Sequence, residues 1–279
     1  MIQTNPFAEL ATVISPVAMQ AYIILMLLLV VGGTILDMLH KKSAQYFFEN
    51  AKKAKKSAKR TVGVGEKGAL AVKTIANEVL TSGEFANPRR RISHLFTMYG
   101  FILFVVTTAT LIFAYPGTTE VPAMLPQLWH LGAAMLCFGG YWFWFFIRVD
   151  VSAEGHPWYR VVRADLFIVS LLTTATFALL WSGNQGSTIG WVFFALFIVS
   201  STTLFGSVMW SKFAHMFFKP AAAFQKRVTK ADGSRENLPA DYDLTDPAVQ
   251  AKFPDIPTYM GKVPPNMGLG IKREGSSHY

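Results

Sequence analysis

Apolar residues along this chain are concentrated in five long runs separated by polar segments. The runs cover roughly 21–39, 95–115, 128–147, 165–181 and 190–210. About 20 mostly apolar residues in a helix suffice to cross the hydrocarbon core of a bilayer. Helices of soluble cores are rarely so long and so uniformly apolar. We therefore predict an all-α membrane protein, built as a bundle of five transmembrane helices.

The first run could also be the apolar part of a cleaved signal peptide. A signal peptide has a basic segment before its apolar core and small residues at its cleavage site. Here no Lys or Arg occurs in the first 40 residues, and Lys41 and Lys42 follow the run directly. These features indicate a retained span over residues 21–40, preceded by an external segment of residues 1–20.

The polar segments complete the predicted organisation. Residues 41–93 form a basic loop in which 41–60 and 69–80 show the apolar periodicity of amphipathic helices. The second of these could lie along the membrane surface or dock a partner. Residues 94–218 hold the remaining four spans. Gly32–Gly33 and Gly139–Gly140 fall inside spans, where glycine usually permits close helix packing.

Residues 219–279 form a segment rich in proline, predicted to be an extended tail. It contains seven prolines and seven acidic residues, yet large apolar residues recur among them. A purely solvating disordered segment normally lacks such residues. Two interpretations remain open, namely a disordered tail and an extended arm that becomes ordered on a partner.

Charge sets the predicted orientation. All 26 Lys and Arg residues fall on one side of the five spans: 13 between Lys41 and Arg91, three between Arg148 and Arg163, and ten from Lys212 onward. The positive-inside rule then places the N-terminus outside and the C-terminus in the cytoplasm. The net charge of +9 is explained by this topology and by lipid headgroups, so nucleic acid is not an expected partner.

The single cysteine, Cys137, limits the redox chemistry that the chain could carry. It lies inside the third span, so no disulfide can form within the chain. An iron–sulfur cluster needs about four cysteine ligands. Any such cluster in a redox assembly must therefore come from a separate protein.

Two histidines are candidate ligands of a b-type haem, which needs two imidazoles at the same depth on different helices. His94 lies at the start of the second span, where the chain leaves the cytoplasmic side. His215 lies at the end of the fifth span, where the chain returns to that side. Arg90, Arg91 and Lys212 could pair with haem propionates. Alternatively, both histidines are simply hydrated at headgroup level.

Two stretches resemble a known family. Pro88–Arg–Arg–Arg–Ile–Ser–His94 and Ser211–Lys–Phe–Ala–His215 are similar to the second and last spans of the nitrate reductase gamma-subunit-like family. That family includes membrane subunits of quinone-interacting complexes. The resemblance implies two b haems held by four histidines. Only His94 and His215 match; Phe104 and residues 196–201 offer no ligand for an external haem, so at most one haem is expected.

Within this family, the closing sequence from Pro264 resembles the anchors associated with dissimilatory adenylylsulfate reductase in sulfur-oxidising bacteria. The resemblance implies a bacterial inner-membrane location and a cytoplasmic flavin and iron–sulfur reductase as partner. That partner would dock on the basic inner face and residues 220–279, and electrons would reach quinone.

A quinone site needs an apolar slot with one or two polar groups. Asp37 with His40 and Asp165 are candidates on the inner side, and Trp129–His130 on the outer side; the inner side is preferred, because no outer haem is expected. For Asp165, a helix N-terminal acid is the favoured role. The tryptophans at positions 129, 142, 144, 158 and 181 are interpreted as interfacial belt residues.

These observations predict a membrane anchor subunit that links a cytoplasmic oxidoreductase to quinone and has no catalytic centre of its own. A purely structural anchor and a haem-bearing quinone oxidoreductase subunit of another respiratory complex are the alternatives. A transporter is less favoured, because five spans do not divide into matching halves.

Overall fold

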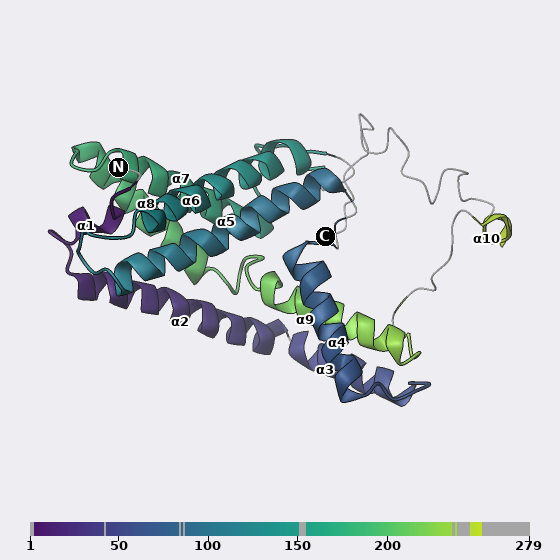
Figure 1. The fold of residues 1–279 in the computed structure, drawn as a ribbon. Coiled ribbons are helices and arrows are strands. Elements are labelled where there is room, and N and C mark those ends of the chain that lie inside the picture. Colours follow the sequence, from purple (N-terminus) through teal and green to yellow (C-terminus); the bar gives the residue numbers. More distant parts are fainter. Residues whose placement is uncertain are drawn as a thin grey trace.

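The protein was analysed as a computed structural model, which describes residues 3–41, 43–83, 85, 87–150, 155–235, 238 and 246–252. Within these residues the chain is helical and contains no β-strand (Figure 1). Five helices are long and apolar enough to cross a membrane. The predicted all-α, five-span architecture is therefore confirmed.

The first four spans start and end close to the predicted limits. The first is α2 (Pro16–Lys41), which begins five residues earlier than expected. The second is α5 (Pro88–Phe113). The third is α6 (Met124–Trp142) with its π-helical end η2 (Phe143–Ile147). The fourth is the 3₁₀ turn η3 (Arg163–Asp165) followed by α7 (Leu166–Gly183).

The fifth span, α8 (Thr188–Gly206), is shorter than predicted, and His215 does not belong to it. Residues 207–214 form a turn in which Ser211 Oγ accepts a hydrogen bond from Phe213 N. Such a local side-chain bond competes with the helical pattern and helps to end it. Val208 in this turn is fully buried, as non-helical backbone at membrane depth must be.

A new helix, α9 (His215–Ala231), follows the turn and includes Pro220. The first part of the predicted extended tail is therefore helical. Pro220 removes one hydrogen bond from α9, but the helix is held by packing against α4 (Val64–Thr74). A short helix, α10 (Pro247–Lys252), lies further on. The residues of the tail from 253 onward lie outside the described part of the chain.

A seam of small residues joins α5 and α6, which pack closely and antiparallel. A Cβ on Gly100 would lie 2.8 Å from Gly132 O, and one on Gly139 would lie 2.6 Å from Ser93 O. The Ser93 hydroxyl donates to Gly139 O at 2.8 Å. Small residues spaced seven apart on both helices thus let the two backbones meet.

Three of the four span glycines noted in the sequence are packing positions. Gly139 lies in the α5–α6 seam, Gly140 faces Leu172 on α7, and Gly33 on α2 faces Val208. Close packing is confirmed at these three. Gly32 has open space around its Cβ position, so the packing interpretation is wrong there.

The chain segment before the first span is folded into one end of the bundle. Helix α1 (Pro6–Leu10) buries Phe7 against Trp129 and Trp181, with ring centroids 5.9 and 5.5 Å apart. Asn5 Nδ2 donates to Tyr115 O and Thr118 O. We call this the α1 end of the bundle.

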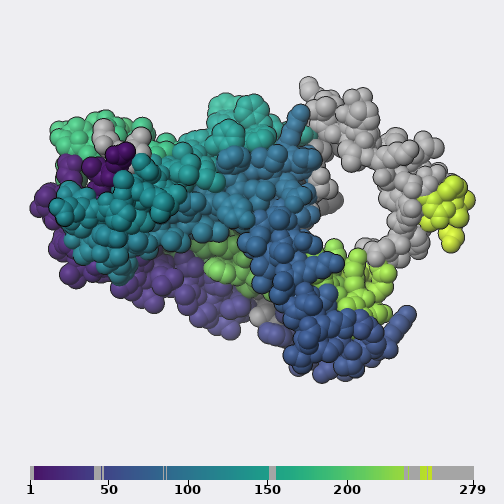
Figure 2. Space-filling model, in the orientation of Figure 1, coloured from purple at the N-terminus to yellow at the C-terminus, as the bar shows by residue number. Residues whose placement is uncertain are grey.

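The other end carries a group of helices that extends beyond the spans (Figures 1 and 2). It consists of α3 (Ser43–Lys56), α4 with its π-helical continuation η1 (Ile75–Leu80), and α9. Arg227 pairs with Glu78 at 2.6 Å, which joins α9 to η1. We call this the basic end, because its exposed side chains include Lys52, Lys53, Lys55, Lys56, Lys226 and Lys230.

Arg60 connects the start of α4 to the last turn of α9. Its Nε donates to Ala231 O at 2.6 Å, and its two other nitrogens hold Glu66. The backbone N–H groups of Lys59 and Arg60 donate to Asp232 O. A helix C-terminus leaves carbonyl groups without helical partners and favours positive charge, so this contact caps α9.

Candidate functional site

His94 lies near the start of α5 at the basic end, and its ring is half-buried. Its Nδ1 is 2.9 Å from Ser82 Oγ, and its ring packs on Phe85 with centroids 4.9 Å apart. Ser82 is 1% exposed and has a φ of 49°, a conformation that non-glycine residues rarely adopt. The turn between η1 and α5 therefore holds the hydroxyl against the imidazole.

His215 begins α9, directly after the buried turn that ends the fifth span. Its Nδ1 is hydrogen-bonded to Lys212 O, and its ring meets Phe167 of α7 edge-on at 5.6 Å. Phe167 also packs against the buried Phe213 at 5.4 Å. This histidine is therefore held between the turn and the start of the fourth span.

The two histidines lie at the same end of the bundle, as the sequence predicts. Phe85 links their surroundings: its ring packs on His94 and lies 5.3 Å from the Lys219 ammonium. Lys219 is four residues from His215, so both project from one face of α9. Each imidazole presents Nδ1 to a hydrogen-bonding oxygen, as metal-bound histidines usually do when Nε2 meets the metal.

The cationic candidates for propionate binding take different positions. Arg90 lies 5.3 Å above the Phe85 ring, close to His94. The Arg91 Nε donates to Thr81 O at 2.6 Å, so this side chain secures the turn before α5. Lys212 is exposed beside His215. Among the described residues, no three His, Cys, Asp or Glu side chains gather as a metal site.

A large apolar cavity of about 680 Å³ lies between α2 and the other four spans. Its volume is within the range of ligand pockets, roughly 300–1,000 Å³. The α1 end of the cavity is bounded by Phe7, Leu10 and Ile14, and the basic end by Phe213, Met216 and Phe217. Neither histidine lines it, but Met216 directly follows His215. The cavity therefore extends from α1 to the immediate neighbourhood of that histidine.

The wall of the cavity is almost entirely aliphatic and aromatic. Tyr22, Thr108, Thr174 and Ser201 supply its hydroxyl groups, and none of the described residues that line it is charged. Phe104 is part of the wall, at the position where the resembled family has a histidine. Its ring packs against Trp129 at 5.2 Å and Phe197 at 6.4 Å.

The two α2 residues proposed at a quinone site differ in burial. Asp37 is 2% exposed and continues the face of α2 that carries the cavity residues Met26 and Val30. His40, three residues further, is exposed. Asp37 therefore faces inward beyond the basic end of the cavity, whereas His40 faces outward.

Asp165 has a structural role that occupies both its oxygens. Arg148 Nε donates to Oδ1 at 3.3 Å, Arg148 Nη2 pairs with Oδ2, and the Val162 N–H donates to Oδ2 at 2.8 Å. The carboxylate lies at the start of α7, the position predicted for a helix N-terminal acid. Its bonds to Arg148 and Val162 support that role over quinone binding.

The belt interpretation is wrong for the tryptophans that the structure buries. Trp129 is 0% exposed and donates its indole N–H to Thr108 Oγ1 at 2.9 Å, and Trp181 is 4% exposed. Trp144 is also buried, with its ring 4.2 Å from the Arg148 guanidinium. His130, beside Trp129, is hydrogen-bonded to Pro126 O and Ser182 Oγ. The outer quinone candidates are therefore parts of the core.

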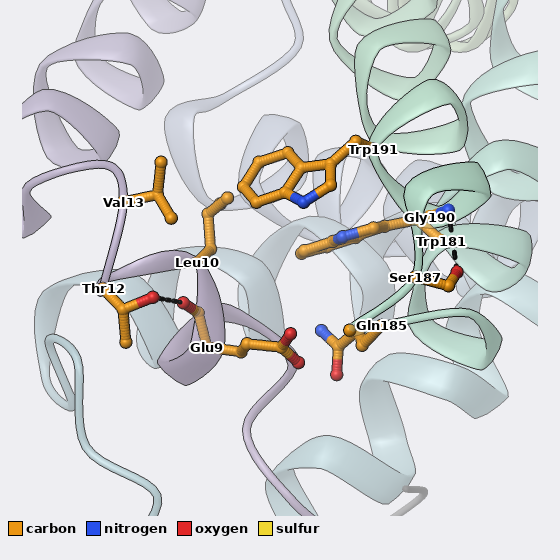
Figure 3. A pocket seen from close by; sticks show the side chains of 10 residues that line it. Glu9, Leu10, Thr12, Val13, Trp181, Gln185, Ser187, Gly190 and Trp191 are labelled. Carbon is orange, nitrogen blue, oxygen red and sulfur yellow. Dashed lines mark hydrogen bonds between the residues drawn. The ribbon is translucent and has the colours of Figure 1, made fainter.

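A second, small pocket of about 100 Å³ lies where α1 meets the turn between α7 and α8. Figure 3 shows Leu10 of α1 facing Trp181 and Trp191 there, with Glu9 and Gln185 at the rim. Gln185 Nε2 donates to Pro6 O at 2.5 Å. The pocket marks the join between α1 and the bundle, and it shows how α1 closes the large cavity.

The comparisons with known proteins give no relative for this chain: no family model, no curated protein and no solved structure matches it.

Proposed function

We propose that this protein is a membrane subunit of the bacterial inner membrane that docks a cytoplasmic oxidoreductase and links it to the quinone pool. In this proposal the basic end faces the cytoplasm and α1 faces outside. The partner carries the flavin and iron–sulfur centres, as adenylylsulfate reductase does in the systems that the sequence resembles.

The apolar cavity is the observation that carries the link to quinone. It lies inside the spans and ends next to His215 at the basic end, where a cytoplasmic redox protein would dock. A cavity of this size with few polar groups fits an isoprenoid ligand better than a hydrophilic substrate. An anchor with a structural role alone has no need for such a cavity.

The exposed lysines of α3 and α9 support docking of an acidic partner. These lysines belong to helices that extend beyond the spans (Figure 1). Charge complementarity of this kind speeds encounter and orients the partner. Residues 232–279 would extend the contact area as a partner-binding arm.

A b haem fits the donor chemistry of the basic end. His94 and His215 would hold its iron through Nε2, and Arg90 and Lys212 would lie near its propionates. When bound, the haem would carry single electrons between the partner and quinone. Ser82 and the Lys212 carbonyl would fix the orientation of the two imidazoles.

Helix α4 and η1 would lie along the membrane surface in this orientation. Tyr99, five residues after His94 in α5, donates its hydroxyl to Leu80 O at 2.7 Å, and this bond holds the end of η1 against the basic end of the second span. One face of α4 packs on α9, and Val72, Ile75 and Leu80 remain exposed. Such an apolar stripe beside Lys73 suits the headgroup region.

The test is co-sedimentation of a purified oxidoreductase of this class with membranes that contain the full chain. We expect it to pellet with these membranes and to reduce added quinone there. A chain ending at Asp232 keeps α9 and its contacts, and should lose most of the bound reductase. If the reductase stays soluble with the full chain, the docking proposal is wrong. If it pellets but never reduces quinone, a structural anchor is the correct reading.

A further inference from the structure

The large cavity has the shape of a slot along α2. Its α2 residues run from Ala18 to Val30, which spans about 18 Å at 1.5 Å per residue. Across from α2 it is lined by α5 and α8. The slot therefore follows the membrane normal over much of the thickness of the hydrocarbon core.

Helix α2 is attached to the rest of the bundle at few points beside this slot. Gln20 Nε2 donates to Ile112 O at 3.2 Å, the Tyr22 hydroxyl contacts α8, and Gly33 packs against Val208. Many of its side chains, including Leu27 and Leu28, are exposed. A ligand from the bilayer can therefore reach the slot sideways past α2, whereas α1 closes it from its own end.

Tyr22 differs from the other hydroxyl residues of the wall. Thr108 and Thr174 donate to carbonyl groups of their own helices at 2.7 Å, and Ser201 does the same to Phe197 O. The Tyr22 hydroxyl instead reaches across to α8, 2.8 Å from Ser201 Oγ and 3.0 Å from Thr202 Oγ1.

The hydroxyl proton of Tyr22 can therefore be redirected to a ligand. The Tyr22 hydroxyl is within donating distance of Ile198 O at 3.3 Å and of Ser201 Oγ at 2.8 Å, and Ser201 keeps its own carbonyl bond if Tyr22 turns away. Tyr22 thus supplies a hydrogen-bond donor to the half of the apolar slot nearer α1.

We propose that the slot binds one isoprenoid quinone, whose ring carbonyl accepts a hydrogen bond from Tyr22 and whose tail lies along α2. This inference rests on the proposed link to quinone, and it places the ring deeper than Asp37 and His40. A phospholipid is the rival occupant. Its charged headgroup meets no counter-charge among the described residues of the wall, and the hydrocarbon of its acyl chains offers Tyr22 no acceptor.

Quinone retained by the purified full chain provides the first test. The chain is extracted in mild detergent, and its lipids are separated and quantified by mass spectrometry. We expect about one quinone per chain. Met26→Trp, which fills the slot at a buried position, should remove it. Leu28→Trp, on the lipid-facing side of the same helix turn, should leave it unchanged. Tyr22→Phe should weaken retention about threefold to tenfold, as the loss of one hydrogen bond predicts.

A photoreactive azidoquinone provides a second test on the unaltered chain, so that the result does not depend on any variant folding. We expect it to label the α2 segment around Tyr22. The proposal is overturned if the label is confined to residues near His40, or if the purified chain contains no quinone. It is also overturned if the lipid that Met26→Trp loses, and Leu28→Trp keeps, is a phospholipid.

The outcome is separable from that of the docking experiment. If Met26→Trp loses quinone but its membranes still bind the oxidoreductase, both the slot and the anchor stand. If quinone is retained by the wild-type chain but no oxidoreductase binds, the anchor proposal fails and the slot stands.

Discussion

The guanidinium of Arg148 and the carboxylate of Asp165 form a fully buried ion pair that ties the end of η2 to the start of α7. Arg148 also donates to Pro157 O at 3.1 Å and Arg160 O at 2.6 Å. The pair therefore fixes the loop between the third and fourth spans as well as the two helix ends.

Removing one member of this pair should destabilise the protein strongly. Arg148→Met leaves the Asp165 carboxylate buried without its counter-charge, and we expect a loss of about 3–5 kcal/mol in the free energy of unfolding. Arg163→Met, at an exposed position nearby, should change it by less than about 0.5 kcal/mol. Unfolding in mixed micelles measures both. Equal effects would show that the pair has no special role.

The seam between α5 and α6 predicts a contrast between two glycines. Gly100→Ala would push a methyl group into backbone atoms of α6, and overpacking of this kind costs about 1–3 kcal/mol. Gly32→Ala meets open space, so the better helix propensity of alanine should leave stability unchanged or raise it by up to about 1 kcal/mol. The same unfolding assay, applied to both variants, checks the contrast; a harmless Gly100→Ala would contradict the seam.

A haem between α5 and α9 predicts a spectrum. The reduced-minus-oxidised difference spectrum of the purified protein should show the α-band of a b haem, and His94→Ala and His215→Ala should each abolish it. His156→Ala, in the loop at the same end, should retain it. Protein that folds and binds its partner but shows no α-band would disprove the haem assignment.

The contact of Arg60 with Glu66 predicts a dependence on pH. Hydrogen bonds from Arg60 lower the pKa of Glu66 below its usual value, so the contact contributes stability at pH values where glutamate is charged in both states, above about pH 5. That contribution is lost as pH falls through the lowered pKa. Hydrogen exchange at the start of α4 should therefore accelerate in acid. This acceleration should be smaller at high salt, because salt already screens the attraction between two exposed groups.

The control for this pH effect is Glu66→Gln, which cannot titrate. In that variant the exchange rates, corrected for their intrinsic pH dependence, should already be fast at neutral pH and should not change further in acid. An acid-induced acceleration of the same size in both proteins would show that another group is responsible.

The spans could be predicted from the sequence because apolar length and charge are local properties. The apolar runs predict the limits of α6 and α7 to within about four residues, whereas α5 begins seven residues before its predicted start. The lysines of α3 and α9 lie at one end. Arg148 shows the limit of this reading: it counts as an inner-side charge in the sequence, yet it is fully buried. Charge shows on which side a residue lies, and only packing shows what it contacts.

The remaining features depend on tertiary contacts between segments far apart in the chain. The sequence around Phe7 does not predict that this ring packs against Trp129 and Trp181, because both lie more than 100 residues away in the chain. The turn after α8 packs Val208 against Gly33, which lies 175 residues earlier in the chain. Tyr22 was overlooked because its partner, Ser201, lies equally far away. Its one available signal was a tyrosine within an otherwise apolar run.

The sparse attachment of α2 has a consequence for biogenesis. The ribosome completes α2 long before it makes α8, which supplies the Val208 and Ser201 contacts. During that interval α2 has its contacts with α5, such as the Gln20 bond to Ile112 O, but not those with α8, and its largely apolar surface suits it to lipid. By contrast, α5 and α6 are consecutive in the chain, so they can pack against each other as soon as both are inserted. Assembly would then finish when α2 is recruited to the completed hairpins, and this late step is where we expect insertion factors to matter most.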